Sequence, residues 1–531
     1  MNTLLSRFST NPKNDILSGL TVALALVPEA VAFAFIAGID PLVGLYGAFM
    51  MGMVTAVFGG RPGMISGATG AMAVVMVYMI QQGNLVGNQL DNPVENLGLY
   101  WLFITLLFVG AIQITAGIFK LGKFVRLIPH PVMMGFINGL AIVIFISQLG
   151  LFKTTTNGTS NWLSGNTLYI MLALVGLTML IMYFLPKLTK KIPAALAAIL
   201  IVAMITIFGG IDVSTVGSFI RDGGGEGLQG GLPQFQLEVF QLFYTLNGHW
   251  DLILSTAFLL AAVGLIESLM TLNLIDEITE SRGSGNRECL AQGAANILNG
   301  LFGGMGGCAM IGQSLINISN GARARLSGIV ASVMLLVFVM FGSSLIEAVP
   351  MAALTGLMIM VSLGTFEWAS IRTFNKMPKS DVIVMVLVTV VTAVLHNLAL
   401  AVLIGVIISA LIFSWDNAKR IRARKTIDDS GVKHYEIYGP LFFGSISVFN
   451  EKFDLQNDPD EVVIDFQESR VVDMSAIEAL NGLTERYAAL GKTVHLKHLS
   501  GDCRKLLHNA EKIIEVNVME DPQYKVVTDD L

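Results

Sequence analysis

The feature that most constrains this chain is a nearly unbroken apolar region from about residue 15 to residue 415. Short polar breaks divide it at intervals of about 20–25 residues, the length that an α-helix needs to cross ~30 Å of hydrocarbon. Only 14% of the residues are charged, against about 25% in an ordinary soluble domain. The chain therefore cannot cover a water-facing surface of its size, which excludes a soluble enzyme, a disordered chain and a nucleic-acid-binding protein.

The polar breaks predict an all-α polytopic membrane domain of fourteen spans, with the first span retained rather than cleaved as a signal peptide. The predicted spans lie near 16–37, 42–59, 67–81, 99–118, 127–149, 167–185, 193–209, 252–274, 289–302, 308–318, 327–343, 346–365, 381–395 and 397–414. Lys and Arg gather in the loops that follow even-numbered spans, and the opposite loops contain almost none. By the positive-inside rule, both termini are expected in the cytoplasm.

Two predicted spans, 67–81 and 308–318, are short and follow glycine-rich segments. Each is the third span of its half if the fourteen spans divide into seven plus seven. Short, glycine-interrupted spans at matching positions predict an inverted repeat in which two half-helices meet near the middle of the membrane. The amino-terminal end of a half-helix offers free N–H groups and a positive dipole end, so two such ends form an anion site without a charged side chain. The alternative is that these glycines only allow close helix packing.

Two carboxylates fall in the interior of predicted spans rather than at their ends, and an intramembrane carboxylate is a functional candidate because its insertion costs a few kcal/mol. Glu29 follows Pro28 in the first span, and Glu267 holds the related position in the eighth span. Glu267 is predicted to bind the coupling ion, as a proton carrier or as a Na⁺ ligand together with Thr271. The alternative is a structural role, in which backbone or hydroxyl groups satisfy each carboxylate.

The composition changes after Trp415, where a basic segment precedes about a hundred residues of ordinary soluble composition. We expect a transmembrane transport domain over 1–415, a basic linker over 416–433 and a soluble domain over 434–531. Strands at 461–466 and 493–496 alternate with helices at 475–490 and 502–510, which predicts a small α/β domain. The three cysteines, Cys289, Cys308 and Cys503, show no metal-ligand spacing, so neither a zinc site nor a disulfide framework is predicted.

Four motifs are distinctive: Pro28-Glu29-Ala30-Val31-Ala32-Phe33, Ser66-Gly67-Ala68-Thr69-Gly70, Ile266-Glu267-Ser268 and Asn286-Arg287-Glu288-x-x-x-Gln292-Gly293-x-x-Asn296. Through them the chain resembles the sulfate permease (SulP) family over essentially its whole length. The tail is similar to the family's STAS domain, through Val463-Ile464-Asp465-Phe466 and Val472-Asp473-Met474-Ser475. The resemblance implies a UraA-like fold of two seven-span repeats, a bacterial inner-membrane location, and a homodimer whose transport domains move against gate domains.

The resemblance also implies which residues surround the substrate, between the third and tenth helices and opposite the first and eighth. The expected substrate-binding residues are Glu29, Phe33, Thr69, Gly70, Ile311, Gly312, Gln313 and Ser314. Glu29 replaces the family's usual Gln, and Gln313 replaces an Arg of the animal and cyanobacterial members, so this site is less positive than theirs. Ser475 matches a serine that is phosphorylated in anti-sigma-factor antagonists and is therefore a candidate phosphosite; the alternative is a docking role for the tail.

A site with Gln313 and Glu29 favours a monovalent anion, because a doubly charged one is expensive to desolvate against helix dipoles alone. We therefore expect a secondary active transporter of a small inorganic anion, with bicarbonate ahead of sulfate or a dicarboxylate. No cofactor is expected beyond Na⁺ or H⁺ as the coupling ion. The alternatives are an anion channel, a membrane-tethered STAS sensor and, disfavoured by the tail, a nucleobase transporter.

Overall fold

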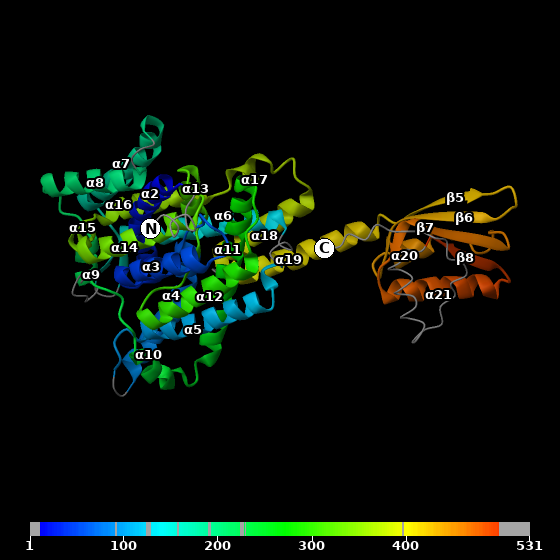
Figure 1. Cartoon of the computed structure of the whole chain (residues 1–531), viewed down its shortest axis with the longest axis horizontal. Coiled ribbons are helices and arrows are strands. Elements are labelled where there is room, and N and C mark those ends of the chain that lie inside the picture. Colours follow the sequence, from blue (N-terminus) through cyan, green and yellow to red (C-terminus); the bar gives the residue numbers. More distant parts are fainter. Residues whose placement is uncertain are drawn as a thin grey trace. The chain divides into compact units, whose positions relative to one another are not determined.

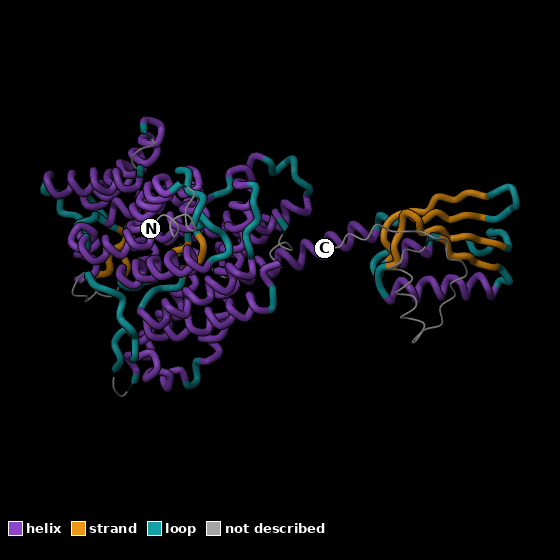
Figure 2. The backbone as a smooth tube through the Cα atoms, in the orientation of Figure 1, coloured by secondary structure: helices purple, strands orange, loops and turns teal. Residues whose placement is uncertain are grey.

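The computed structural model describes residues 11–90, 93–123, 129–156, 159–189, 193–222, 228, 230–395 and 398–498. The chain forms two compact units, Met1–Val406 and Ile407–Leu531. The first is almost entirely helical and the second contains a four-stranded sheet (Figures 1 and 2). The predicted tail helix at 502–510 and Cys503 lie outside the described residues.

Fourteen of the described helices correspond in order to the fourteen predicted spans. The first seven are α2 (Pro12–Ala37), α3 (Pro41–Phe58), α4 (Gly70–Gln89), α5 (Leu97–Ile118), α6 (His130–Gln148), α7 (Asn166–Leu188) and α8 (Ala194–Phe208). The second seven are α11 (Trp250–Thr279), α12 (Gly285–Phe302), α13 (Ile311–Ser319), α14 (Arg325–Phe341), α16 (Met351–Thr365), α18 (Lys379–Leu395) and α19 (Leu398–Ala418). The predicted all-α polytopic fold is confirmed.

Seven segments in the described part of the chain are long and apolar enough to cross a membrane, and three shorter helices are also apolar. The prediction of two short spans holds for α13, which has nine residues, and is wrong for α4, which has twenty. The predicted span ended at residue 81, before the polar residues Gln82 and Asn84, but the helix continues through both. Hydropathy alone underestimates a helix whose last turns are polar.

The helices pack in pairs that repeat between the two halves of the chain. In the first pattern, α5 packs on α11 and α12, and the equivalent α14 packs on α2 and α3. In the second, α6 packs on α18, and the equivalent α16 packs on α7. Each half therefore completes its core with helices of the other half, which is the packing expected of an inverted repeat.

Short segments connect these helices. They are β2 (Lys153–Thr156) paired with β3 (Thr159–Trp162), the helices α9 (Val216–Asp222), α10 (Glu238–Gln241), α15 (Ser343–Glu347) and α17 (Trp368–Arg372), and the 3₁₀ turns at Leu149–Phe152 and Leu242–Leu246.

Two short strands cross inside the helical unit, immediately before the two helices predicted to start within the membrane. Strand β1 (Ser66–Ala68) precedes α4, and β4 (Gly307–Ala309) precedes α13. The strands pair antiparallel with Gly67 opposite Cys308, and all six of their residues are buried. Extended backbone at this depth has no water to bind, so the strands pair with each other, and side chains bind the N–H and C=O groups that the pairing leaves over.

The second unit is a four-stranded sheet in the order β5-β6-β7-β8. Its strands are β5 (Arg422–Ile427), β6 (Lys433–Leu441), β7 (Glu461–Val471) and β8 (Thr493–Lys497), with helices α20 (Ile446–Asn450) and α21 (Met474–Ala489). The pair β5–β6 is antiparallel, while β6–β7 and β7–β8 are parallel. Part of the expected linker, 416–433, is thus strand β5, so the sheet begins before the predicted boundary at 434.

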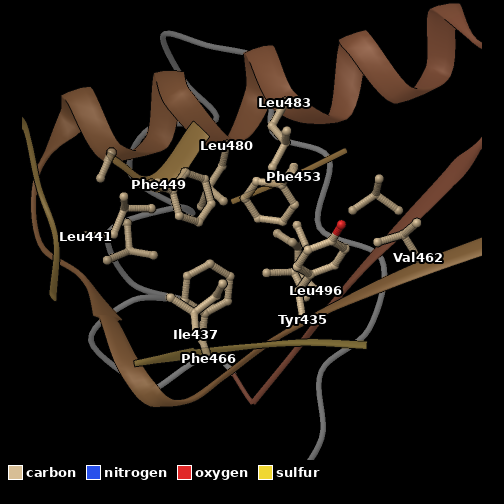
Figure 3. Close-up of a cluster of buried hydrophobic side chains, with 14 of the residues drawn as sticks. Tyr435, Ile437, Leu441, Phe449, Phe453, Val462, Phe466, Leu480, Leu483 and Leu496 are labelled. Atoms are coloured by element: carbon tan, nitrogen blue, oxygen red, sulfur yellow. The ribbon is translucent and has the colours of Figure 1, made fainter. Parts of the chain in front are cut away.

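The core of this unit lies between the sheet and α21 (Figure 3). Leu480 and Leu483 of the helix face Tyr435, Ile437 and Phe466 of the strands. Tyr435 also carries a polar group into this apolar core, and its hydroxyl donates to Asp458 Oδ2 at 2.7 Å.

Asp458 is a buried carboxylate with three donors. Tyr435 and Tyr487 donate to Oδ2, and Lys433 forms an ion pair with Oδ1. Burial alone raises the pKa of Asp458, but the bonds from Lys433, Tyr487 and Tyr435 outweigh it and hold that pKa below its ordinary value. The pKa of the Tyr487 hydroxyl is raised, by burial first and by Asp458 second.

Replacing Asp458 with Asn should destabilise the second unit by roughly 2–4 kcal/mol, because Lys433 then loses its counter-charge and two buried hydroxyls lose an ionised acceptor. Because the pKa of Asp458 is lower in the folded state, its contribution should be present above about pH 4 and lost as the pH falls through the folded value. Hydrogen exchange of β6 and β7 in the whole protein measures both effects. An exposed control, Asp460→Asn, should leave exchange unchanged; equal protection in both variants contradicts the assignment.

Replacing Gly307 with Ala should separate the crossing strands. An added Cβ there would lie 2.2 Å from the Gly67 carbonyl oxygen, a backbone atom that cannot rotate away. Overpacking of a core costs roughly 1–3 kcal/mol, so the melting temperature in detergent should fall. Gly176→Ala is the matched control, because nothing lies within 4 Å of a Cβ at that position. Equal melting temperatures for the two variants would show that the strands tolerate separation.

Candidate functional site

The first half of the candidate site is the start of α4. Thr69 is the N-cap, in an extended conformation, and its side chain makes no cap hydrogen bond. Its hydroxyl instead lies 3.2 Å from Cys308 Sγ. The next residue, Gly70, lies against Phe33, because a Cβ at Gly70 would be 2.8 Å from the Phe33 ring. The predicted residues Phe33, Thr69 and Gly70 are therefore brought together.

The second half is the start of α13. Met310 is its N-cap and also lacks a side-chain cap bond. Ile311 is half-buried and Gly312 is exposed, with no atom within 4 Å of a Cβ built at Gly312. The first turn of this helix thus has open space beside it, while its N–H groups have no capping side chain.

Ser314 has a structural role that the sequence did not predict. Its buried hydroxyl accepts a bond from the Ile65 N–H at 2.9 Å, and the Met310 N–H donates to the Ile65 carbonyl at 2.8 Å. These bonds join the start of α13 to the residue before β1. In this structure Ser314 therefore holds the half-helix in place, and its hydroxyl oxygen is directed to backbone.

The two predicted polar residues Glu29 and Gln313 contact each other directly. Gln313 is buried, with 3% of its surface exposed, and its amide Nε2 donates to Glu29 Oε2. Glu29 is half-buried in the middle of α2. The pair joins the first helix to the third residue of α13, beside that helix's positive end.

The second carboxylate has a different partner. The Cys308 thiol donates to Glu267 Oε2 at 2.9 Å, so Cys308 lies between Glu267 and Thr69. Thr271 is buried one turn from Glu267, and its hydroxyl donates to the Glu267 carbonyl oxygen at 2.8 Å. The neighbouring Ser268 hydroxyl accepts from the Ala309 N–H at 3.1 Å and ties α11 to β4.

This geometry combines two uncapped helix ends with two carboxylates that have unlike partners. The helix ends favour negative charge, and a carboxylate favours a proton or a cation. The Glu267 carboxylate and the Thr271 hydroxyl oxygen are ligand types that Na⁺ accepts, and they share one face of α11 because they are four residues apart. The arrangement can hold an anion and a cation or proton within one buried region.

Sequence reasoning did not mark the polar stripe on α12, formed by Glu288, Gln292 and Asn296, as a functional element. Glu288 is fully buried and accepts from the Gly60 N–H at 2.7 Å and from Gln292 Nε2 at 2.7 Å. Gln292 Nε2 also donates to the Ser66 hydroxyl of β1 at 2.9 Å. The Glu288 and Gln292 side chains therefore anchor the segment from Gly60 to β1.

Asn296 continues this stripe one turn later. Its Nδ2 donates to the Gly307 carbonyl at 3.2 Å and to Gln113 Oε1 at 2.9 Å, while its Oδ1 accepts from the Gly307 N–H at 3.1 Å. One side chain thus holds both backbone groups of the first residue of β4. The spacing of 288, 292 and 296 is the helical i, i+4, i+8 pattern, which puts the three side chains on one face of the helix, but nothing in the sequence indicates that this face contacts β1 and β4.

The candidate phosphosite Ser475 lies at the second position of α21. Asp473 caps this helix by accepting from the Ala476 N–H at 2.9 Å, and Ser475 is half-buried. The first turn of a helix stabilises added negative charge.

An apolar cavity of about 1120 Å³ is lined by α2, α4, α6, α11 and α19. It reaches Ile266 but none of the predicted substrate-binding residues. Its lining is mostly apolar.

Family models match both units of the chain. The model described as "Sulfate permease family" matches residues 13–388, and the model described as "STAS domain" matches residues 424–521. Among curated relatives, the chain is 39% identical to "Putative sulfate transporter YbaR" of Bacillus subtilis (strain 168), over 95% of this chain and 98% of that protein. It is 29% identical to "Bicarbonate transporter BicA" of Synechocystis sp. (strain ATCC 27184 / PCC 6803 / Kazusa), over 94% and 91%.

Solved structures show the same fold. The transmembrane domain of a cyanobacterial bicarbonate transporter BicA superposes with a TM-score of 0.61 at 30% identity, covering 75% of this chain and 97% of that one. Murine Slc26a9, an anion transporter solved in the inward-facing state, superposes with a TM-score of 0.78 at 18% identity, covering 95% and 88%.

Replacing Asn296 with Leu should leave both backbone groups of Gly307 without a partner, each loss costing about 1–3 kcal/mol. The variant should therefore melt at a lower temperature in detergent and lose anion binding. Asn247→Leu is the control, because Asn247 is exposed at a loop before α11. Unchanged melting and binding for Asn296→Leu contradict the anchoring role.

Proposed function

The chain belongs to the sulfate permease family, and from that premise we propose that it is a secondary active transporter of a small inorganic anion, with bicarbonate the favoured substrate. The observation that supports the proposal most directly is the meeting of two uncapped helix ends at Thr69 and Met310, next to two intramembrane carboxylates. An anion would lie against the first turns of α4 and α13, with Phe33 and Gln313 beside it.

Bicarbonate is favoured over sulfate by the charge of the site. None of the predicted substrate-binding side chains is cationic, and Glu29 adds a negative group. Helix dipoles equal only about half a charge at each end, which suits one negative charge better than two. The relatives' printed names include both a sulfate and a bicarbonate transporter, so sulfate or a dicarboxylate is the second candidate.

Coupling to Na⁺ or H⁺ is assigned to Glu267. Its contact with Cys308, which in turn contacts Thr69, gives the coupling residue a short connection to the anion site. Transport would occur as the helices around α4 and α13 move against the group that contains α6, α7, α16 and α18. The proposal places both termini in the cytoplasm of a bacterial inner membrane and the protein in a homodimer.

Uptake by proteoliposomes tests this function. Radiolabelled bicarbonate, sulfate and a dicarboxylate are each supplied at alkaline pH, with and without an inward Na⁺ or proton gradient. Bicarbonate should accumulate above its external concentration only when the driving gradient is present. A channel would equilibrate the anion without accumulating it, and a membrane-tethered sensor would show no flux while Ser475→Ala altered its output.

Replacing Glu267 with Gln should abolish gradient-driven accumulation while the protein still folds, because the amide is close in shape but carries neither the charge nor the proton. Residual exchange of anion across the membrane should persist. Glu277→Gln is the control on the same helix, since Glu277 is exposed. If Glu267→Gln concentrates substrate as the unmodified protein does, the coupling assignment is wrong.

A further inference from the structure

The direct contact between Glu29 and Gln313 is unusual for an anion site, because it places an acceptor-only group where a negative solute must approach. An ionised carboxylate has about four lone-pair positions, and Gln313 uses one of them. A carboxylate in this position repels an incoming anion unless that anion brings a hydrogen atom to share. The site therefore contains both hydrogen-bond donors and one strong acceptor.

The donors and the acceptor lie on opposite sides of the contact. Gln313 and the first-turn N–H groups of α13 offer hydrogens, and Glu29 of α2 offers none. Gly312, next to Gln313 in the chain, is exposed and has open space beside it, so the first turn of α13 is accessible to a small solute. A solute that replaces the direct Glu29–Gln313 bond must accept from Gln313 and donate to Glu29.

We propose that Glu29 is a specificity-determining residue that selects oxyanions carrying a hydroxyl hydrogen. Bicarbonate satisfies both sides, since its O–H donates to Glu29 while its charged oxygens accept from Gln313 and the helix N–H groups. Sulfate and nitrate have only acceptors, so they would face the Glu29 carboxylate without a hydrogen between them. This inference rests on the proposed function, because it needs the anion to bind at the start of α13.

The expected ratio of affinities depends on the free energy lost when a buried polar group has no hydrogen-bond partner. A site built to hydrogen-bond a substrate hydroxyl rejects the analogue that lacks it far more strongly than an apolar pocket rejects a missing methylene, by up to about 10⁴–10⁵. Glu29 is only half-buried, so we expect a smaller factor, of at least about 10. An anion without a hydroxyl hydrogen is rejected by electrostatic repulsion from the Glu29 carboxylate as much as by the loss of a hydrogen bond.

The second carboxylate cannot provide the same selection. Glu267 receives its bond from the Cys308 thiol of β4, and Gln313 of α13 bonds to Glu29. The two acids therefore have different roles: Glu267 binds the coupling ion, and Glu29 accepts a hydrogen bond from the hydroxyl group of the substrate.

Two pairs of anions isolate the hydroxyl hydrogen from charge and shape. Bicarbonate and nitrate are planar monoanions of similar size, and hydrogen phosphate and sulfate are tetrahedral dianions. Each is used to compete with labelled bicarbonate for binding to the full-length protein at one fixed alkaline pH. The unmodified protein should prefer the hydroxyl-bearing member of each pair at least about tenfold.

The Glu29→Gln variant should bring both preferences close to one, chiefly by improving the binding of nitrate and sulfate. Glu29→Asp, which keeps the carboxylate, should retain part of both preferences, and Glu277→Gln should retain them fully. The comparison within the unmodified protein needs no variant, so misfolding of Glu29→Gln does not remove the test.

Two results would overturn the inference in distinguishable ways. If the unmodified protein binds all four anions with no preference within either pair, or if Glu29→Gln keeps the preferences, Glu29 is not selective and the anion-transport function stands. If the unmodified protein binds none of the four anions, the proposed function fails and the selectivity of Glu29 fails with it.

Discussion

The structure depends on one constraint: backbone that leaves the helical conformation inside hydrocarbon must find all its hydrogen bonds within the protein. Strands β1 and β4 meet it by pairing with each other, and Asn296 binds both backbone groups of Gly307. Once these strands are satisfied, two helices can begin in the middle of the bundle rather than at its surface. The positive ends of those helices then lie within the bundle, which is the physical basis of the proposed anion site without lysine or arginine.

The scaffold is nearly symmetric, but the side chains placed on it are not. Helix α2 and its equivalent α11 each bring one carboxylate toward the crossing strands. The carboxylate of α2 meets an amide, and that of α11 meets a thiol. Because a symmetric fold would otherwise give two equal sites, the roles proposed for the two acids, Glu29 at the substrate and Glu267 at the coupling ion, rest on this difference in partners.

The second unit follows the same rule, that a buried polar group must find its hydrogen-bond partners within the protein. Asp458 is buried beside the apolar core, and it is tolerated because Lys433, Tyr435 and Tyr487 all donate hydrogen bonds to it. This cluster joins the loop before β7 to β6 and to α21. Ser475, at the start of α21, therefore lies on a unit that has its own packed core.

The sequence alone determined the fold class, the fourteen spans, the repeat and the glycine-rich break before the third span of each half, because hydropathy and glycine placement depend only on local chain chemistry. Glu29 and Glu267 stand out in the sequence as carboxylates within apolar spans, while Thr69 and Gln313 are expected site residues through the family resemblance. The sequence could not show that Gln313 bonds to Glu29, that Cys308 joins Glu267 to Thr69, or that Ser314 and the α12 stripe hold the strands. Those partners lie more than forty residues apart in most cases, and only the packing of the two repeats against each other brings them within hydrogen-bonding distance.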